Sequence, residues 1–261
     1  FAILKYGFEA NLAYSFGSKG EGKAQFKSLS GLVVDKAQQV YIGDAKKSLV
    51  NAFVVEAGQS IPLLPKSAGR ASMKWLENIP SEVEQIAWDG KETFYAVNKD
   101  KKSLTTIRKG AVSGSIKLND MQLSAVTVDK AGAVWVLDKK GRRCAKLDEA
   151  GKVVMSFGSS GSGAGQFSDP SAIAISSSGM VFVADRSNHN VQIFRGDGVF
   201  LNALNGDNGS KLSAPVALSF DQRDNLYILD SSRGSVLAYS SSGQSLGEFG
   251  KAKDGSSLLN K

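Results

Sequence analysis

The chain has 261 residues, of which 42% are hydrophobic and 28 are glycine, a composition that suits a turn-rich globular protein with a sizeable core. Its formal net charge of +7 biases its partners towards anionic surfaces, and no apolar run approaches the roughly 18 residues of a membrane span. Cys144 is the only cysteine and His189 the only histidine, which excludes an intrachain disulfide, a cysteine-based zinc site and a multi-histidine metal site.

The first elements expected along the chain are two strands in the segment 3–17, which ends in Phe-Gly. The same pattern of 15 residues recurs at 144–158 and 236–250. The link that follows it also recurs, with Gln-Phe at the same place in 16–35 and 157–176. Self-similarity of this kind is the mark of a repeat architecture, so the repeats decide the fold.

Five copies of one pattern lie at intervals of 40 to 54 residues, each with a polar residue, an aromatic residue six positions later and a second polar residue nine positions later. The columns are Asp35, Asp89, Asp129, Ser176 and Asp221, then Tyr41, Tyr95, Trp135, Phe182 and Tyr227, then Asp44, Asn98, Asp138, Asp185 and Asp230. Because catalysis needs one special site, we interpret a pair that is present in every copy as structural. The polar side chains would accept backbone N–H groups in the following turn, and the rings would pack between sheets.

Each copy divides into four short strands, which we name a to d. Strand a precedes the first polar residue, strand b carries the aromatic residue, strand c follows the second polar residue, and strand d often ends in Phe-Gly. The linker between strands a and b has a constant length, as expected of a hairpin whose turn fixes the register. One such meander cannot bury both of its faces alone. Neighbouring copies must therefore stack, and four strands per roughly 45 residues is the unit of a β-propeller.

The best copy, GQFSDPSAIAISSSGMVFVADRSNHNVQIF at 165–194, resembles the repeat of the NHL-repeat family. It has Gly-x-Phe, a proline, an apolar strand, a glycine turn, an apolar strand ending in Ala-Asp, and Asn-His before a further apolar strand. The resemblance extends over nearly the whole chain and is weakest at about 73–118, which lacks Phe-Gly and has Asn98 in place of aspartate.

The resemblance implies an all-β fold, a β-propeller that forms one domain over 1–261. The family usually closes as six blades, with one blade split between the termini. We expect blades at about 18–64, 65–118, 119–158, 159–206 and 207–250, and a split blade from 1–17 and 251–261. Strands a and b of the split blade are expected to be missing from this chain, and a five-bladed ring is the alternative.

Three other features were weighed as chemical sites. The segment 17–23, GSKGEGK, has the spacing of a phosphate loop, but Ala24 lacks the hydroxyl that binds magnesium, and a strand rather than a helix follows. His189 lies in the loop between strands b and c, without a nucleophile elbow elsewhere. Cys144 aligns with strand residues and is expected to be a buried small hydrophobe. We therefore predict no catalytic residues, no metal ligands and no cofactor, and favour a protein that is not an enzyme.

Charge is the strongest feature that does not repeat. Loops of an antiparallel meander alternate between faces, so the b–c loops and the d–a links share one face. The b–c loops carry a candidate basic surface, made of Lys46, Lys47, Lys99, Lys101, Lys102, Lys139, Lys140, Arg142, Arg143 and Arg186, with Arg233 in the last copy. The d–a links are expected to add Lys19, Lys23, Lys27, Lys66, Arg70 and Lys74. The simpler interpretation is ordinary solubilising charge on loop tips.

The sequence therefore predicts a non-catalytic binding or scaffold protein that presents a basic face to an acidic protein or another polyanion. Binding of RNA, which some domains of this family perform, is the first alternative, although the one ring expected near the basic loops is Trp75, in a d–a link. A hydrolase or lyase with a metal in the central channel is the second. Because the chain starts at Phe1 inside an expected strand, a preceding leader would not be visible, and we expect export if the source is bacterial. The oligomeric state is left open.

Overall fold

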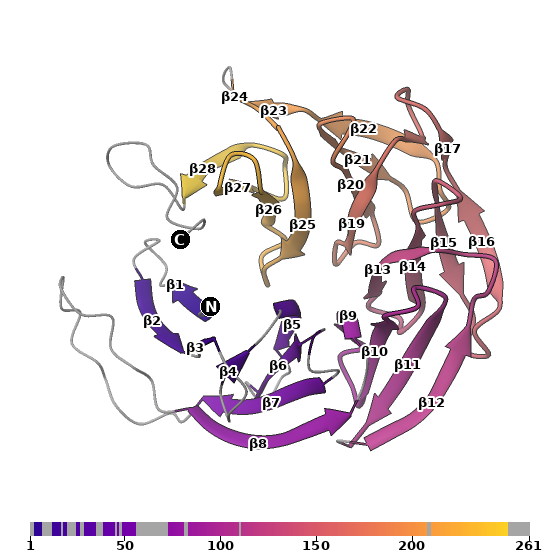
Figure 1. The fold of residues 1–261 in the computed structure, drawn as a ribbon. Helices are drawn as coiled ribbons and strands as arrows, with labels where there is room; N and C mark the ends of the chain where they lie inside the picture. Colours follow the sequence, from indigo (N-terminus) through magenta and orange to yellow (C-terminus); the bar gives the residue numbers. More distant parts are fainter. Residues whose placement is uncertain are drawn as a thin grey trace. The chain divides into compact units, whose positions relative to one another are not determined.

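The computed structural model is all-β wherever it is described, with five four-stranded and four two-stranded sheets (Figure 1). It describes the backbone of residues 3–6, 12–16, 18–19, 25–26, 29–34, 39–44, 46, 49–55, 73–80, 83–109, 111–207 and 210–249, and the side chains of 44, 46, 85–109, 111–206 and 211–248. None of these residues belongs to a helix that could cross a membrane. The chain divides into two compact units, Phe1–Asp100 with Leu104–Ser115, and Lys101–Ser103 with Ile116–Lys261.

The first unit holds one four-stranded antiparallel sheet and most of a second. The strands of the first sheet are β5 (Leu29–Val34), β6 (Gln39–Asp44), β7 (Leu49–Val55) and β8 (Met73–Pro80). Those of the second are β9 (Val83–Trp88), β10 (Thr93–Asn98), β11 (Ser103–Arg108) and β12 (Ala111–Lys117). The two a strands, β5 and β9, contact each other. Two short pairs precede these sheets: β1 (Ile3–Tyr6) with β2 (Leu12–Phe16), antiparallel, and β3 (Ser18–Lys19) with β4 (Gln25–Phe26), parallel.

The second unit holds three further antiparallel sheets, each in sequence order. Their strands are β13 (Leu123–Val128), β14 (Val134–Asp138), β15 (Arg143–Leu147) and β16 (Val153–Phe157); β19 (Pro170–Ile175), β20 (Val181–Asp185), β21 (Asn190–Phe194) and β22 (Phe200–Leu204); and β25 (Pro215–Phe220), β26 (Leu226–Asp230), β27 (Ser235–Tyr239) and β28 (Ser245–Phe249). The d–a links contain the pairs β17 (Ser159–Ser160) with β18 (Gln166–Phe167) and β23 (Gly206–Asp207) with β24 (Ser210–Lys211). Since β13 contacts β19 and β19 contacts β25, the a strands of successive sheets lie side by side. The predicted repeat of four antiparallel strands is confirmed.

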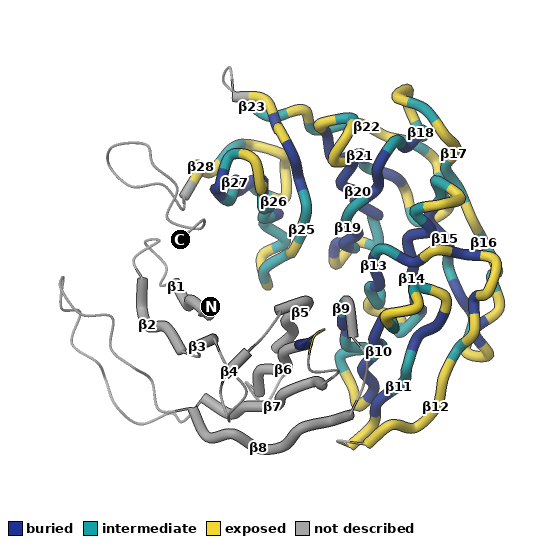
Figure 2. The backbone as a smooth tube through the Cα atoms, in the orientation of Figure 1, coloured by how far each residue is buried: buried dark blue, intermediate teal, exposed yellow. Residues whose placement is uncertain are grey.

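Strand b is the most buried strand of the third and fourth sheets. Every residue of β14 and β20 is buried, whereas β12, a d strand, is exposed along nearly its whole length (Figure 2). A strand that is covered on both faces reads as a continuous apolar run, so these segments show no alternation of apolar and polar residues. Between the third and fourth sheets, the ring of Phe194 packs against Phe157 at 4.6 Å and Phe167 at 5.8 Å between centroids. The repeated Phe-Gly and Gln-Phe motifs therefore supply core rings.

One boundary differs from the prediction. Residues 73–80 pair with β7, with Trp75 opposite Phe53, so they form strand d of the first sheet. Trp75 and Lys74 accordingly lie in a strand and not in a d–a link, and the first sheet extends past the expected boundary at 64/65. The c–d connection of this sheet is long, and the segment lacks the Phe-Gly that marks strand d elsewhere. Lys66 and Arg70 belong to this connection, which lies outside the described residues.

The number of blades and the closure of the ring stay predictions. Residues 250–261, which would complete the split blade with 1–17, lie outside the described part of the chain. Within that part, β1 and β2 form a separate two-stranded sheet, with Ile3 opposite Phe16.

Candidate binding surface

A buried aspartate anchors the b–c loop in each sheet of the second unit. These residues are Asp138, Asp185 and Asp230, each with 0% of its surface exposed. The carboxylate of Asp185 accepts the backbone N–H groups of Ser187 and Asn188 in its own loop, at 3.1 and 3.0 Å. It also accepts those of Ser168 and Asp169 in the preceding d–a link, at 2.6 and 3.0 Å. One carboxylate therefore ties two loops of the same face together.

The other two aspartates make the same connection. Asp138 accepts the N–H groups of Gly141 in its loop and of Gln122 in the preceding link, both at 3.0 Å. Asp230 accepts the N–H group of Ala214 in its preceding link at 2.9 Å. Sequence reasoning predicted only the bonds to the following turn, because a partner 16 residues earlier leaves no local signal. The result is a face on which the b–c loops are held rigidly against the d–a links.

In the four copies whose a–b turn is described, the first polar residue caps that turn on the opposite face. Asp129 accepts the N–H groups of Ala131 and Ala133 at 3.0 and 2.9 Å, and its other oxygen accepts the indole N–H of Trp135 at 3.0 Å. Burial acts to raise the pKa of Asp129, but the hydrogen bonds from Trp135 and Ala133 and the charge of Lys146 outweigh it and hold the pKa below its ordinary value. The contact between the aromatic column and the aspartate column was not foreseen from the sequence.

Asp169 draws together two residues of the candidate basic surface. Lys139 Nζ lies 2.6 Å from Asp169 Oδ1, and Arg186 Nε donates to Oδ2 at 2.7 Å. Because Asp169 is only 8% exposed, water screens these pairs weakly. Burial acts to raise the pKa of Asp169, yet the hydrogen bonds and charges of Lys139 and Arg186 prevail and lower it. These two cations, from the loops of adjacent sheets, are thus engaged with a carboxylate of the protein itself.

Two more arginines have carboxylate partners. Arg143 Nε lies 3.0 Å from the buried Asp138 Oδ2, and Arg233 Nη2 lies 2.6 Å from Glu248 Oε2. Four of the six basic residues in the b–c loops of the second unit's sheets are therefore ion-paired; the six are Lys139, Lys140, Arg142, Arg143, Arg186 and Arg233. Fewer basic side chains are therefore available to bind an anionic partner than the sequence indicated.

Lys140 and Arg142 are the two that make no ion pair among the described residues. Lys140 is exposed, and Arg142 is half-buried with a backbone φ of 51°. The fourth position after the anchoring aspartate adopts this left-handed conformation in all three loops, with His189 and Gly234 at the equivalent places. The turn therefore fixes the direction in which the side chain of Arg142 extends from the backbone.

The loop between β10 and β11 supplies further cations. Lys99 and Lys102 are exposed, and Lys101 is half-buried with a φ of 58°. The carbonyl groups of Lys102 and Lys101 accept the N–H groups of Leu118 and Leu123, each at 2.7 Å. This loop is thereby joined to the link that enters β13, which in turn carries Gln122, the residue bonded to Asp138 and Lys139.

Several predicted residues are not tested by these contacts. Lys46 is exposed, and Asp44 is buried. The side chains of Lys19, Lys74 and Tyr41 are not among those described, and Asp35, Lys23, Lys27 and Lys47 lie outside the described residues altogether.

The two residues that the sequence raised as possible reactive groups, His189 and Cys144, lie in different surroundings. His189 is exposed, and its Nδ1 contacts the carbonyl oxygen of Ser213 in the next d–a link. Cys144 is fully buried, and burial raises the pKa of its thiol. Among the side chains that are described, no three His, Cys, Asp or Glu residues gather in a way that could hold a metal ion.

Solved structures with a similar arrangement define the class of protein. A chain in the crystal structure of a nidogen/laminin complex superimposes with a TM-score of 0.65, at 13% identity, over 88% of this chain and 82% of that one. Selenomethionine-substituted virginiamycin B lyase from Staphylococcus aureus gives 0.62, at 15% identity, over 87% of this chain and 71% of the lyase. At such identities the likeness establishes the fold alone. The sheets and these likenesses together define a β-propeller protein.

Sequence matches identify an NHL repeat in this chain. The model of the NHL repeat matches residues 167–194. Human NHL repeat-containing protein 3 is 32% identical over 95 residues, which cover 34% of this chain and 27% of that protein. Caenorhabditis elegans protein lin-41 is 41% identical over 63 residues, 24% of this chain and 5% of that protein. These matches support an NHL-repeat protein, and the chain spans about a quarter or less of these curated relatives.

Proposed function

We propose that this propeller is a non-catalytic binding module that holds an acidic protein partner on its b–c loops. The observation that carries the proposal is the seating of the loop 138–143: the buried Asp138 bonds this loop to the preceding d–a link, so that Lys140 and Arg142 extend from a fixed backbone. Preorganised loops lose little conformational entropy on binding, and their charge speeds encounter with an acidic partner.

The surface that we propose is narrower than the full set of basic residues. Within the second unit it is centred on the loop 138–143, where Lys140 and Arg142 carry charge, and includes Lys102. Lys139 and Arg186 instead stabilise the junction between two sheets through Asp169. These paired cations contribute little to the field that a partner meets.

An acidic protein fits the described surface better than RNA does. Sequence-tolerant binding of single-stranded RNA uses exposed rings on which bases stack. The exposed large hydrophobic side chains in the described part of the chain are Val112, Val154, Val199, Leu201 and Leu246, none of them aromatic. Without such rings, cations on loops favour carboxylate groups of a protein surface.

The structure also decides which variants test the proposal. Replacing Arg143 with glutamate would place a second carboxylate beside the buried Asp138, and replacing Lys139 with glutamate would do the same beside Asp169. Both changes would therefore lower the stability of the fold, and a loss of binding could not be assigned to the surface charge. The pair Lys140→Glu and Arg142→Glu avoids this problem. The matched control is Lys130→Glu with Lys152→Glu, two exposed residues of the same sheet in its a–b and c–d turns, which changes the net charge equally.

The test measures binding to poly-L-glutamate and to polyuridylate at several salt concentrations. We expect Lys140→Glu/Arg142→Glu to weaken binding of poly-L-glutamate by about tenfold, whereas Lys130→Glu/Lys152→Glu weakens it much less. Equal losses in the two double variants would mean that only net charge matters, and the proposed surface would be wrong. Tighter binding of polyuridylate than of poly-L-glutamate at equal salt would favour the RNA alternative.

A further inference from the structure

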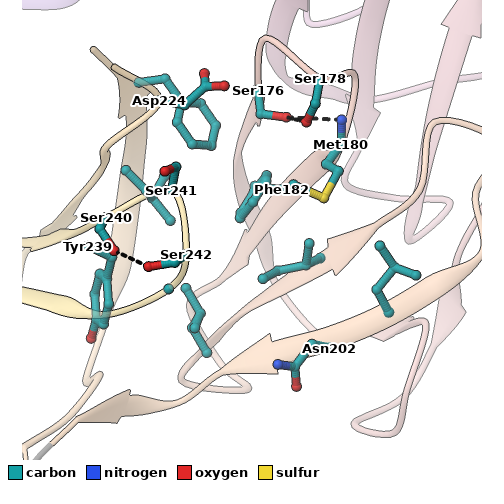
Figure 3. Close-up of a pocket in the computed structure, with 16 residues that line it drawn as sticks. Ser176, Ser178, Met180, Phe182, Asn202, Asp224, Tyr239, Ser240, Ser241 and Ser242 are labelled. Carbon is teal, nitrogen blue, oxygen red and sulfur yellow. Dashed lines mark hydrogen bonds between the residues drawn. The ribbon is translucent and has the colours of Figure 1, made fainter. Parts of the chain in front are cut away.

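A cavity of about 580 Å³ lies between the fourth and fifth sheets, away from the basic loops (Figure 3). Its inner wall is apolar: Phe182 and Phe220 meet edge to face at 4.9 Å between centroids, and Met180, Ile193 and Leu226 line it beside them. Its volume falls within the range of roughly 300–1,000 Å³ that is usual for small-molecule sites, which are likewise mostly apolar with a few polar groups.

Two turns with the same sequence form the mouth of this cavity. One is Ser-Ser-Ser-Gly at 176–179, between β19 and β20, and the other is Ser-Ser-Ser-Gly at 240–243, between β27 and β28. Figure 3 shows Ser176 and Ser178 above Phe182, and Ser240, Ser241 and Ser242 to its left, on the other side of the opening. The two turns come from different sheets, and one is an a–b turn while the other is a c–d turn. The same four-residue sequence therefore occurs on both sides of the mouth.

The serine in the first position stands where an aspartate caps four other turns of this kind. Ser176 Oγ accepts the N–H group of Met180, and Ser240 Oγ accepts that of Gln244, both at 3.1 Å. Carboxylates make the equivalent bond in the turns that begin at Asp89, Asp129, Asp148 and Asp221. The turn geometry is thus retained, while two negative charges are absent from the rim of the cavity.

Two further rim hydroxyls, those of Ser178 and Ser242, bond to the first serine of their own turn. Ser176 Oγ lies 2.9 Å from Ser178 Oγ, and Ser240 Oγ lies 2.8 Å from Ser242 Oγ. The carboxylate among the described lining residues is that of Asp224, which accepts the backbone N–H of Ser177 at 2.9 Å, and Tyr239 lines the cavity as well. Among the described residues that line the cavity there is no lysine, arginine or histidine. An apolar body can cover hydroxyls that bond to each other at far lower cost than it could cover carboxylates.

We propose that this cavity binds a neutral, largely apolar small molecule whose uncharged polar end rests against the serine turns. The apolar body would occupy the space beside Phe182 and Phe220, and the hydroxyls and the amide of Asn202 would receive the polar end. The site uses none of the basic loops, so it does not depend on the proposed acidic partner.

The probes are N-phenyl-1-naphthylamine, which is neutral and fluoresces in apolar sites, and 8-anilinonaphthalene-1-sulfonate, which adds a sulfonate to the same ring skeleton. The blocking variant is Ser242→Trp, which places a ring in the mouth from an exposed turn position. Ala150→Trp is the matched control, at the same position of the c–d turn in the third sheet. Ser178→Trp blocks the mouth from the opposite side and replaces Ser242→Trp if that variant loses its native circular dichroism.

We expect saturable binding of one N-phenyl-1-naphthylamine per chain, unchanged in Ala150→Trp and weakened by about tenfold or more in the blocking variants, which is the loss that follows when an apolar ligand is excluded from its pocket. The sulfonated probe should gain little fluorescence that is sensitive to the blocking variants. Absence of saturable binding, or equal binding in Ser242→Trp, Ser178→Trp and Ala150→Trp, would overturn the proposal. Equal, blockable binding of both probes would overturn the assignment of a neutral ligand.

Discussion

The buried aspartate of the b–c loop offers the sharpest test of how the loops are held. In Asp185→Ala, the N–H groups of Ser168, Asp169, Ser187 and Asn188 lose their shared acceptor. The bond to the N–H group of Asp169 is buried and the other three are partly buried. A buried donor left without an acceptor costs about 1–3 kcal/mol, so the loss of roughly two such bonds predicts a decrease of about 2–6 kcal/mol in the free energy of unfolding. This is a large share of the roughly 5–15 kcal/mol that holds a typical domain together.

The measurement is denaturant-induced unfolding at pH 7, with Asp148→Ala as the control. Asp148 also accepts two backbone N–H groups, from Ala150 and Lys152, but both bonds are exposed and water can replace them. The control should therefore lose about 1 kcal/mol or less. If Asp185→Ala is no less stable than Asp148→Ala, the hydrogen bonds of Asp185 to the b–c loop and the d–a link do not stabilise this protein, and the reasoning is refuted.

Three further predictions concern backbone, charge and thiol. Lys109→Gly should stabilise the protein by about 0.5–1 kcal/mol, because the exposed Lys109 has a φ of 49°, which glycine adopts without strain; an unchanged or lower denaturation midpoint would contradict this. The folded-state pKa of Asp169 is lowered, so its pairing with Lys139 and Arg186 stabilises the protein fully above the ordinary value of 3.8, and this stabilisation is lost as the pH falls through the lower folded value. Asp169→Asn should therefore make the free energy of unfolding fall less steeply at acid pH. The same acid dependence in the two proteins would count against the pairing. Cys144 should react with a thiol reagent only as fast as the protein unfolds, since burial raises its pKa and covers it, whereas prompt labelling of the native protein would show that the thiol is accessible.

The repeat predicted most of the fold because each copy carries its own local signals. The run VWVL before Asp138 and the constant a–b spacing indicate strand and turn from neighbouring residues alone. The displaced strand that contains Trp75 could not be found in this way, because a long c–d connection precedes it and no Phe-Gly marks its end. Its pairing with β7 depends on contacts that are distant in the sequence.

The candidate site was predicted less completely, for a related reason. The alternation of loops placed Lys139 and Lys140 on one face, but only the structure separates the paired residue from the exposed one. Asp169, an acidic residue in the d–a link of the same face, could have indicated that Lys139 is ion-paired, but in the sequence it was read only as part of the repeat. The two serine turns were visible in the sequence, but their shared cavity arises from the packing of two sheets.

The central claim, that the b–c loops of this propeller form the partner-binding face, is tested most directly by hydrogen–deuterium exchange with and without poly-L-glutamate. The account predicts slower backbone exchange in the segments 98–103 and 138–143 when the polyanion is bound, and unchanged exchange in the a–b and c–d turns 129–133 and 148–152 of the opposite face. Protection of those turns, with no change in the two b–c loops, would contradict it.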